Sequence, residues 1–209
     1  MFSQMKDSKC KQRVAVDMQF QSLMPLKDIR RIFVQLSHAY GLNRRAENPL
    51  QLSIVNFSGV QSKIFYANPS NHHWDVMFDE RPLDSVFEKT DIVYLTADSK
   101  NVLQKLDSSK VYVIGGLLDH NSLKGHCLEI AKKEGYAHAR LPIDEHVSVL
   151  TINQVFQVLL RYTENNSWKQ SFLEVIPRRK GVLSIMERFE LMNGYIQKND
   201  VCANIVSNV

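Results

Sequence analysis

Short runs of β-branched and aromatic residues alternate with longer stretches of helical periodicity along most of this chain. Strands that alternate with helices form βαβ units, which build a mainly parallel sheet flanked by helices. The sequence therefore predicts an α/β fold. The expected strands span residues 13–20, 50–57, 73–79, 91–96, 110–116 and 138–142.

Three stretches have the spacing of apolar residues that is typical of amphipathic helices. In the first, Pro25 suits the opening turn, apolar residues recur as far as Tyr40, and Gly41 is expected to end the helix. The other expected helices span residues 122–134 and 150–165. No internal repeat, low-complexity tract or linker interrupts the pattern, which favours a single domain.

The composition, 44% hydrophobic and 23% charged, is ordinary for a globular protein. Cys10, Cys127 and Cys202 lie far apart and form no C-x-x-C pair, so we expect reduced thiols in an intracellular protein. No run reaches the length of a membrane span, and the first residues lack the apolar stretch of a signal peptide. A cytoplasmic or nuclear location is expected in preference to a mitochondrial one, with no membrane partner.

The stretch "KVYVIGGLLDHN", residues 110–121, places two glycines at the end of an apolar run and Asp119 three residues later. Ligands of open α/β sheets bind beyond the carboxyl ends of the strands. Asp119 has two open interpretations, a helix cap or a functional carboxylate, and Asn121 or Ser122 could provide the cap instead. The connections that leave predicted strand ends lie around residues 96–100, 115–121 and 142–149.

Other common chemistries lack a matching motif. The double glycine does not have the G-x-G-x-x-G spacing of a dinucleotide fold. Neither a G-x-S-x-G segment nor a plausible Cys-His arrangement indicates a hydrolase. No metal is expected, because the candidate ligands have no recognised spacing. Those candidates are His72, His73, His120, His126 and Asp75.

The net charge of +4 permits an anionic partner, and the cations gather in short clusters that suit a phosphate backbone. Such clusters are also common on ordinary solvated faces. They comprise Lys6, Lys9, Lys11 and Arg13, the doublets Arg30–Arg31 and Arg44–Arg45, and the triplet Arg178–Arg179–Lys180.

Several blocks, read in order, resemble the tRNA N1-methyltransferase family that modifies the purine at position nine of tRNA. They cover roughly residues 13–181 and comprise "VAVDMQF", "QLSHAYGLNRRA", "VYLTADS", "VYVIGGLLDHN", "ARLPIDEH", "LTINQVFQVLLRY", "WKQSF" and "PRRKG". The resemblance implies a SPOUT methyltransferase domain over residues 13–181, with a parallel sheet, a C-terminal trefoil knot and bound S-adenosylmethionine. Residues 1–12 would then be a short basic N-terminal remnant, and 182–209 a tail or short helix.

The resemblance also assigns roles to individual residues. Gly115 and Gly116 would let the backbone approach the methyl donor where a β-carbon would intrude. Asp119 would accept the proton that N1 of guanine loses, and Asp17 and Gln35 would belong to the active-site surroundings or to tRNA handling. The other expected donor contacts are Leu95, Thr96, Leu141, Pro142, Ile143, Leu150, Thr151 and Asn153. The expected phosphate contacts are Arg44, Arg45, Arg178, Arg179 and Lys180.

Two departures from the family pattern concern lengths. Relatives usually carry a long basic extension before the first strand, whereas a dozen residues precede it here, which suggests a trimmed chain. The segment "VSVL" between "LPIDEH" and the next helix is also shorter than usual. The expected protein is a metal-independent, monomeric guanine-9 methyltransferase. The alternatives are adenine-9 or dual specificity within a mitochondrial tRNA-processing complex, and a catalytically inactive tRNA-binding module.

Overall fold

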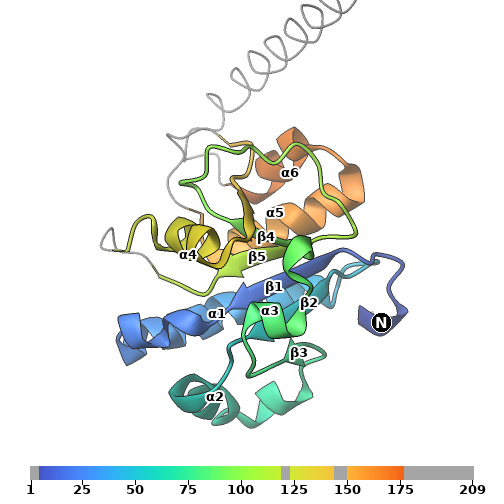
Figure 1. The fold of residues 1–209 in the computed structure, drawn as a ribbon. Coiled ribbons are helices and arrows are strands. Elements are labelled where there is room, and N and C mark those ends of the chain that lie inside the picture. The colour runs from blue at the N-terminus through green and yellow to red at the C-terminus, as the bar shows by residue number, and fades with distance from the viewer. Residues whose placement is uncertain (1–4, 119–122, 144–149, 177–209) are drawn as a thin grey trace, which may run out of the picture.

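The computed structural model describes residues 5–118, 123–143 and 150–176, which contain a single parallel sheet of six strands (Figure 1). The sheet order is β3-β2-β1-β5-β4-β6, and every pairing is parallel. The predicted α/β fold with a mainly parallel sheet is therefore confirmed. The strands are β1 (Arg13–Asp17), β2 (Gln51–Val55), β3 (Met77–Phe78), β4 (Ile92–Leu95), β5 (Val111–Gly115) and β6 (Ala137–Ala139).

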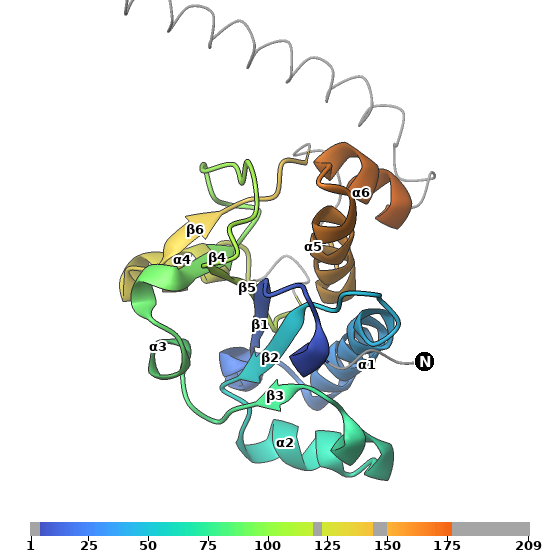
Figure 2. The same cartoon turned by 90° about the vertical axis from the view of Figure 1, so that its right-hand side faces the viewer.

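Helices cover both faces of the sheet. Figure 2 shows α1 and α5 together on one face and α3 and α4 on the other. None of the helices in the described ranges is both long and apolar enough to cross a bilayer. The helices are α1 (Leu26–Asn43), α2 (Gly59–Tyr66), α3 (Leu83–Val86), α4 (His126–Glu134), α5 (Ile152–Asn165) and α6 (Trp168–Val175).

The core lies between the sheet and its helices. Val14 and Val16 on β1 are buried, as are Phe156 and Leu159 on α5. Removing each such side chain from water contributes about 1.5–3 kcal/mol. The apolar stripe expected on the helix at 150–165 therefore faces the core.

Two of the element boundaries that differ from the prediction do so because local side-chain contacts override propensity. Gly41 does not end the first helix, which continues to Asn43. There the side-chain amide of Asn43 accepts from the Leu50 amide at 2.8 Å and donates to the Leu50 carbonyl at 2.9 Å, closing the turn into β2. The strand expected at 73–79 shrinks to two residues, because Pro69–His73 forms a 3-10 turn in which the Asn68 side chain accepts from Ser70.

The helix expected at 122–134 begins four residues later, at His126. Gly125 precedes it with a φ of 84°, a left-handed conformation that interrupts a right-handed helix. The expected C-terminal helix falls outside the described residues.

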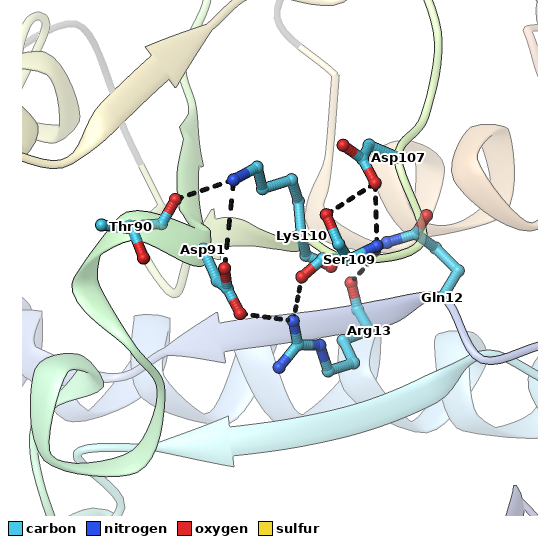
Figure 3. A network of polar contacts seen from close by, with 7 residues as sticks. All are labelled: Gln12, Arg13, Thr90, Asp91, Asp107, Ser109 and Lys110. Atoms are coloured by element: carbon cyan, nitrogen blue, oxygen red, sulfur yellow. Dashed lines mark hydrogen bonds and ion pairs between the residues drawn. The ribbon is translucent and has the colours of Figure 1, made fainter.

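The amino ends of the central strands are joined by a polar network (Figure 3). The Arg13 guanidinium at the start of β1 lies 2.9 Å from the Asp91 carboxylate, and it also donates to the Ser109 carbonyl. Lys110 donates to the Thr90 carbonyl at 2.9 Å. These contacts fix the starts of β1, β4 and β5 at one edge of the sheet, and the candidate site lies at the opposite edge.

Candidate functional site

The carboxyl ends of β1, β5 and β4 meet at one edge of the sheet. Asp17, the last residue of β1, is the register partner of Gly115, the last residue of β5. Beyond that pair, the Gly116 amide donates to the Asp17 carbonyl at 2.8 Å. The structure therefore places the double glycine where ligands of parallel sheets bind, as the sequence predicted.

Both glycines are required by close packing inside the protein. A β-carbon on Gly115 would lie 2.6 Å from Sγ of Cys127 on α4. A β-carbon on Gly116 would lie 2.7 Å from the Asp17 carbonyl oxygen and 2.6 Å from Sδ of Met18. Contacts this short exclude a side chain at either position unless the neighbours move.

The carboxylate of Asp17 is completely buried but has several donors. It accepts from the Asn56 amide at 2.7 Å, the Tyr94 hydroxyl at 2.9 Å and the Gln19 backbone amide at 3.2 Å, and also from the Gln19 side chain. Burial raises the pKa of Asp17, and these hydrogen bonds partly oppose that effect. Burial, followed by the Asp17 charge, holds the pKa of Tyr94 well above its usual value. Asp17 thus joins the ends of β1, β2 and β4 and does not reach solvent.

Gln35 connects α1 to the start of α5. Its side-chain carbonyl accepts from the Ile152 backbone amide at 2.8 Å, which satisfies one of the amides that a helix leaves free at its first turn. The adjacent Thr151 amide donates to the side chain of Gln154 at 3.0 Å, and the Thr151 hydroxyl donates to Asn153 at 2.8 Å. Gln35 therefore helps to hold the segment containing three predicted donor residues, Leu150, Thr151 and Asn153.

The connections after β4 and β6 form the rest of this edge. The Thr96 amide donates to the Ala139 carbonyl at 3.0 Å, and the Arg140 guanidinium donates to the Ile143 carbonyl at 3.3 Å. Leu95, Thr96, Leu141 and Pro142 are buried, whereas Ile143 is half-buried. The predicted donor residues thus lie at the carboxyl ends of β4, β5 and β6 and at the start of α5.

The predicted phosphate contacts are not all beside this site. Arg44 and Arg45 follow α1 immediately before β2, at the amino edge of the sheet, and the Arg44 guanidinium lies 5.7 Å from the centre of the Tyr40 ring. Asp119 and the triplet Arg178–Arg179–Lys180 fall outside the described residues, as do residues 147–149 of the short segment "VSVL".

Three cationic residues at the amino end of α1 are not among the site residues predicted from the sequence. Lys27, Arg30 and Arg31 are exposed in the first turns of α1, which follow the carboxyl end of β1 and extend past the strand tips (Figure 1). The Arg31 guanidinium lies 3.3 Å from the buried carboxylate of Asp28. The Arg30–Arg31 doublet was visible in the sequence, but only the parallel topology puts it near the site.

A polar cavity of about 270 Å³ lies on the α3 and α4 face. Burial, followed by the Asp84 and Glu134 carboxylates, raises the pKa of Tyr136 in this cavity to about 12. No predicted donor residue lines the cavity, but Gln19 and Asn56 do, and both donate to the buried Asp17 carboxylate, so the cavity adjoins the carboxyl ends of β1 and β2. The described residues contain no group of three or more His, Cys, Asp or Glu side chains that could hold a metal ion.

Comparison with known proteins gives a consistent family match. The family described as tRNA (guanine(9)-N(1))-methyltransferase TRM10/TRM10A matches residues 2–181. The tRNA methyltransferase 10 homolog A of Bos taurus is 38% identical over 178 residues, which cover 82% of this chain and 53% of the relative. The tRNA (guanine(9)-N1)-methyltransferase of Schizosaccharomyces pombe is 34% identical over 188 residues, covering 82% and 60%. The chain thus spans little more than half the length of these curated relatives.

Solved structures show the same fold. The crystal structure of the full-length spTrm10–SAH complex matches with a TM-score of 0.77 and 34% identity, covering 81% of this chain and 97% of that one. A dual-specific Trm10 from Thermococcus kodakaraensis matches with a TM-score of 0.63, covering 78% and 99%, at 17% identity, a likeness of fold alone. The resemblance drawn from the sequence blocks is confirmed.

Proposed function

We propose that this chain, which belongs to the TRM10/TRM10A family of tRNA (guanine(9)-N(1))-methyltransferases, transfers a methyl group from S-adenosylmethionine to N1 of guanosine at position 9 of tRNA. The observation that carries the proposal is that the strands β4, β5 and β6, each of which is followed by predicted donor residues, end at one edge of the sheet. There Asp17 holds Gly116 and Gln35 holds Ile152.

The donor contacts fit the chemistry of S-adenosylmethionine. Leu95, Leu141 and Pro142 offer buried apolar surface to an adenine ring and a methionine chain, and Thr96 adds a hydroxyl. Gly115 and Gly116 add backbone without side chains. The remaining contacts would come from Ile143, Leu150, Thr151 and Asn153. When bound, the donor supplies a methyl group activated by its sulfonium charge.

The protein itself then contributes a proton acceptor and residues that hold the segments of the site in position. We assign the acceptor role to Asp119, which follows Gly116 by three residues and would take the N1 proton of guanine. A base of this kind supplies roughly 10² to 10⁴ in rate, and alignment supplies much of the remainder. Asp17 and Gln35 would act by positioning, because each holds a neighbouring segment through a hydrogen bond.

We propose that tRNA is held by cations at both ends of α1. Lys27 and Arg31 would contact phosphates close to the methylated base, since they lie at the site edge. Arg44 and Arg45 would contact a more distant part of the tRNA, and Arg178, Arg179 and Lys180 complete the set. Contacts of this kind orient the RNA without reading its sequence.

The finer fold and cellular assignments are also proposals. We propose that the C-terminal part of the chain forms the SPOUT trefoil knot, a proposal supported by the match to the TRM10/TRM10A family. We also propose that the protein is a monomer and that it is located in the cytoplasm or nucleus.

The proposal is tested by mass mapping of methylated nucleosides on a guanine-9 and an adenine-9 tRNA. We expect 1-methylguanosine at position 9 of the first tRNA and no product on the second. Product on both would replace the proposal with dual specificity. A chain that binds tRNA but gives no calorimetric signal with S-adenosylmethionine would be an inactive binding module, contrary to the proposal.

A further inference from the structure

Asn56, the residue that follows β2, has a backbone conformation that side chains usually avoid. Its φ is 52°, in the left-handed region, and within the described ranges Asn166 is the one other non-glycine residue with a positive φ. Asparagine tolerates this conformation better than most residues, and glycine adopts it at no steric cost. Such conformations persist only where the surrounding contacts over-determine them, and they cluster at functional sites.

The backbone of Asn56 is held by two other segments. Its amide donates at 3.1 Å to the carbonyl of Arg81, in the connection between β3 and α3, and its carbonyl accepts from the Gln61 side chain on α2. Gln61 is fully buried, and among the described residues its Oε1 atom has no hydrogen-bond partner. An unpaired buried acceptor lowers stability, so the protein tolerates a cost at Gln61 while the amide of that residue holds Asn56.

The side chain of Asn56 connects this fixed backbone to the end of β1. Its amide donates to Oδ1 of the fully buried Asp17 carboxylate at 2.7 Å. Through its backbone carbonyl, Asp17 in turn accepts from the Gly116 amide at 2.8 Å. Asn56 is thus linked through one residue to Gly116, a predicted contact of the methyl donor.

The other donors to Asp17 do not duplicate the contact from Asn56. Gln19 lies two residues further along the same segment, so it moves together with Asp17. Tyr94, on β4, donates to Oδ2 at 2.9 Å. Without the Asn56 amide, the Gln19 backbone amide is the only donor to Oδ1 among the residues that the structure describes. Asn56 therefore fixes the Asp17 carboxylate from the β2 side of the sheet.

We propose that Asn56 is a positioning residue of the methyl-donor site, which acts through Asp17 to hold the Gly116 backbone. This inference rests on the proposed function. Without the Asn56 amide, the end of β1 is less constrained and the Gly116 amide loses a fixed acceptor. The donor then has to order this part of its site when it binds, which lowers affinity. The loss falls on binding of the donor and of its product S-adenosylhomocysteine, and kcat at saturating donor is preserved.

The test compares Asn56→Gly and Asn56→Ala with the wild-type 209-residue chain, and Asn166→Gly is the matched control. Both asparagines have a φ of 52°, but Asn166 is exposed at the end of α5. Asn56→Gly accepts the left-handed backbone and removes only the side-chain amide, whereas Asn56→Ala also strains the backbone.

We expect calorimetry to show at least about a threefold loss of affinity for S-adenosylhomocysteine in both Asn56 variants, and wild-type affinity in the control. With S-adenosylmethionine, KM should rise in parallel while kcat stays within about twofold of the wild type. Urea titrations check that each variant is folded under the conditions of the binding experiment.

Two further measurements separate positioning from a general loss of stability. Hydrogen exchange at the Gly116 amide should be faster in both Asn56 variants and unchanged in Asn166→Gly. In an Asp17→Asn background the acceptor of the Asn56 amide is neutral, and the hydrogen bond is weaker. Asn56→Gly should then change the affinity by less than about twofold.

The inference is overturned if Asn56→Gly binds S-adenosylhomocysteine like the wild type. It is also overturned if only Asn56→Ala loses affinity, since backbone strain would then be the cause. An equal effect of Asn56→Gly in the two Asp17 backgrounds would exclude the route through the Asp17 carboxylate. Failure of the proposed function is recognised separately, because the wild type itself would then bind no S-adenosylhomocysteine or transfer no methyl group.

Discussion

The backbone carbonyl of Asp17 accepts a hydrogen bond from the Gly116 amide at 2.8 Å, so the end of β1 and the loop after β5 are in direct contact. This contact leaves no room for a β-carbon on Gly116, and it fixes one side of the candidate donor site.

The two glycines should respond differently to alanine. The new methyl group of Gly115→Ala meets the end of the Cys127 side chain, whereas that of Gly116→Ala also meets the Asp17 backbone. Overpacking of this kind costs about 1–3 kcal/mol. We expect both variants to lose affinity for S-adenosylhomocysteine in calorimetry, and Cys127→Ala to restore affinity to Gly115→Ala alone. Equal rescue of both variants would contradict the assigned contacts.

Asp17 should make the stability of the protein depend on pH. Burial raises its pKa above the ordinary 3.8, so the folded state binds the proton more tightly than the unfolded state. The Asp17 carboxyl group therefore adds most to the free energy of unfolding at low pH. That contribution falls as the pH rises through the pKa of Asp17 in the folded protein. We expect the unfolding free energy of the wild type minus that of Asp17→Asn to fall as the pH rises above 3.8 in urea titrations.

Asp79 provides a control, because its pKa is shifted in the opposite direction from that of Asp17. Hydrogen bonds from Arg81 lower the pKa of Asp79 to about 2, so its contribution is present above 3.8 and is lost as the pH falls toward 2. The difference between the wild type and Asp79→Asn should therefore be flat between about pH 4 and pH 8. An equally flat difference for Asp17→Asn would mean that burial does not raise its pKa.

Gln35→Ala should weaken donor binding through α5. The variant loses the acceptor for the Ile152 amide and loosens the segment that holds Thr151 and Asn153. A hydrogen bond of this type contributes about 1 kcal/mol, which corresponds to roughly a fivefold rise in Kd. Gln35→Glu retains an acceptor oxygen and should bind S-adenosylhomocysteine nearly as well as the wild type. If Gln35→Ala binds like the wild type, Gln35 does not position this part of the site.

Lys27→Ala and Arg31→Ala should each weaken binding to different tRNAs by a similar factor. Loss of one phosphate contact lowers the magnitude of the slope of log K against log salt by about 1. The matched control is Arg161→Ala, because the half-buried Arg161 guanidinium pairs with two carboxylates, those of Glu164 and Glu174, whereas the more exposed Arg31 faces that of Asp28. The same titration applies to Arg45→Ala at the far end of α1. An unchanged slope for Lys27→Ala and Arg31→Ala would remove both residues from the tRNA surface.

Asp119→Asn should slow methylation by about 10² to 10⁴ while leaving donor affinity close to that of the wild type. The asparagine cannot accept the N1 proton but occupies nearly the same volume. Single-turnover rates on a guanine-9 tRNA measure the effect, and calorimetry with S-adenosylhomocysteine checks binding. An unchanged rate would mean that solvent or the substrate takes the proton.

The parts of the fold and site that follow from local pattern were predictable from the sequence. The apolar run before Gly115 gave a buried strand, the glycine pair marked its carboxyl end, and the stripe through Phe156 gave a core helix. These features depend on residues within a few positions of one another, and the parallel topology then brings the strand ends together.

Other features depend on contacts between distant segments, which no local pattern encodes. The acceptor role of Gln35 toward Ile152 joins residues that are 117 positions apart. The burial of Asp17 depends on Asn56 and Tyr94, and the position of Arg44 at the far edge depends on the direction of α1. The placement of β5 between β1 and β4 is likewise a property of the whole sheet.

The sheet is bounded on one side by β3, with two residues, and on the other by β6, with three. Such short edge strands expose few unpaired backbone amide and carbonyl groups to an incoming strand. Growth of the sheet by addition of another polypeptide is therefore disfavoured at both ends, which protects the fold from edge-to-edge aggregation.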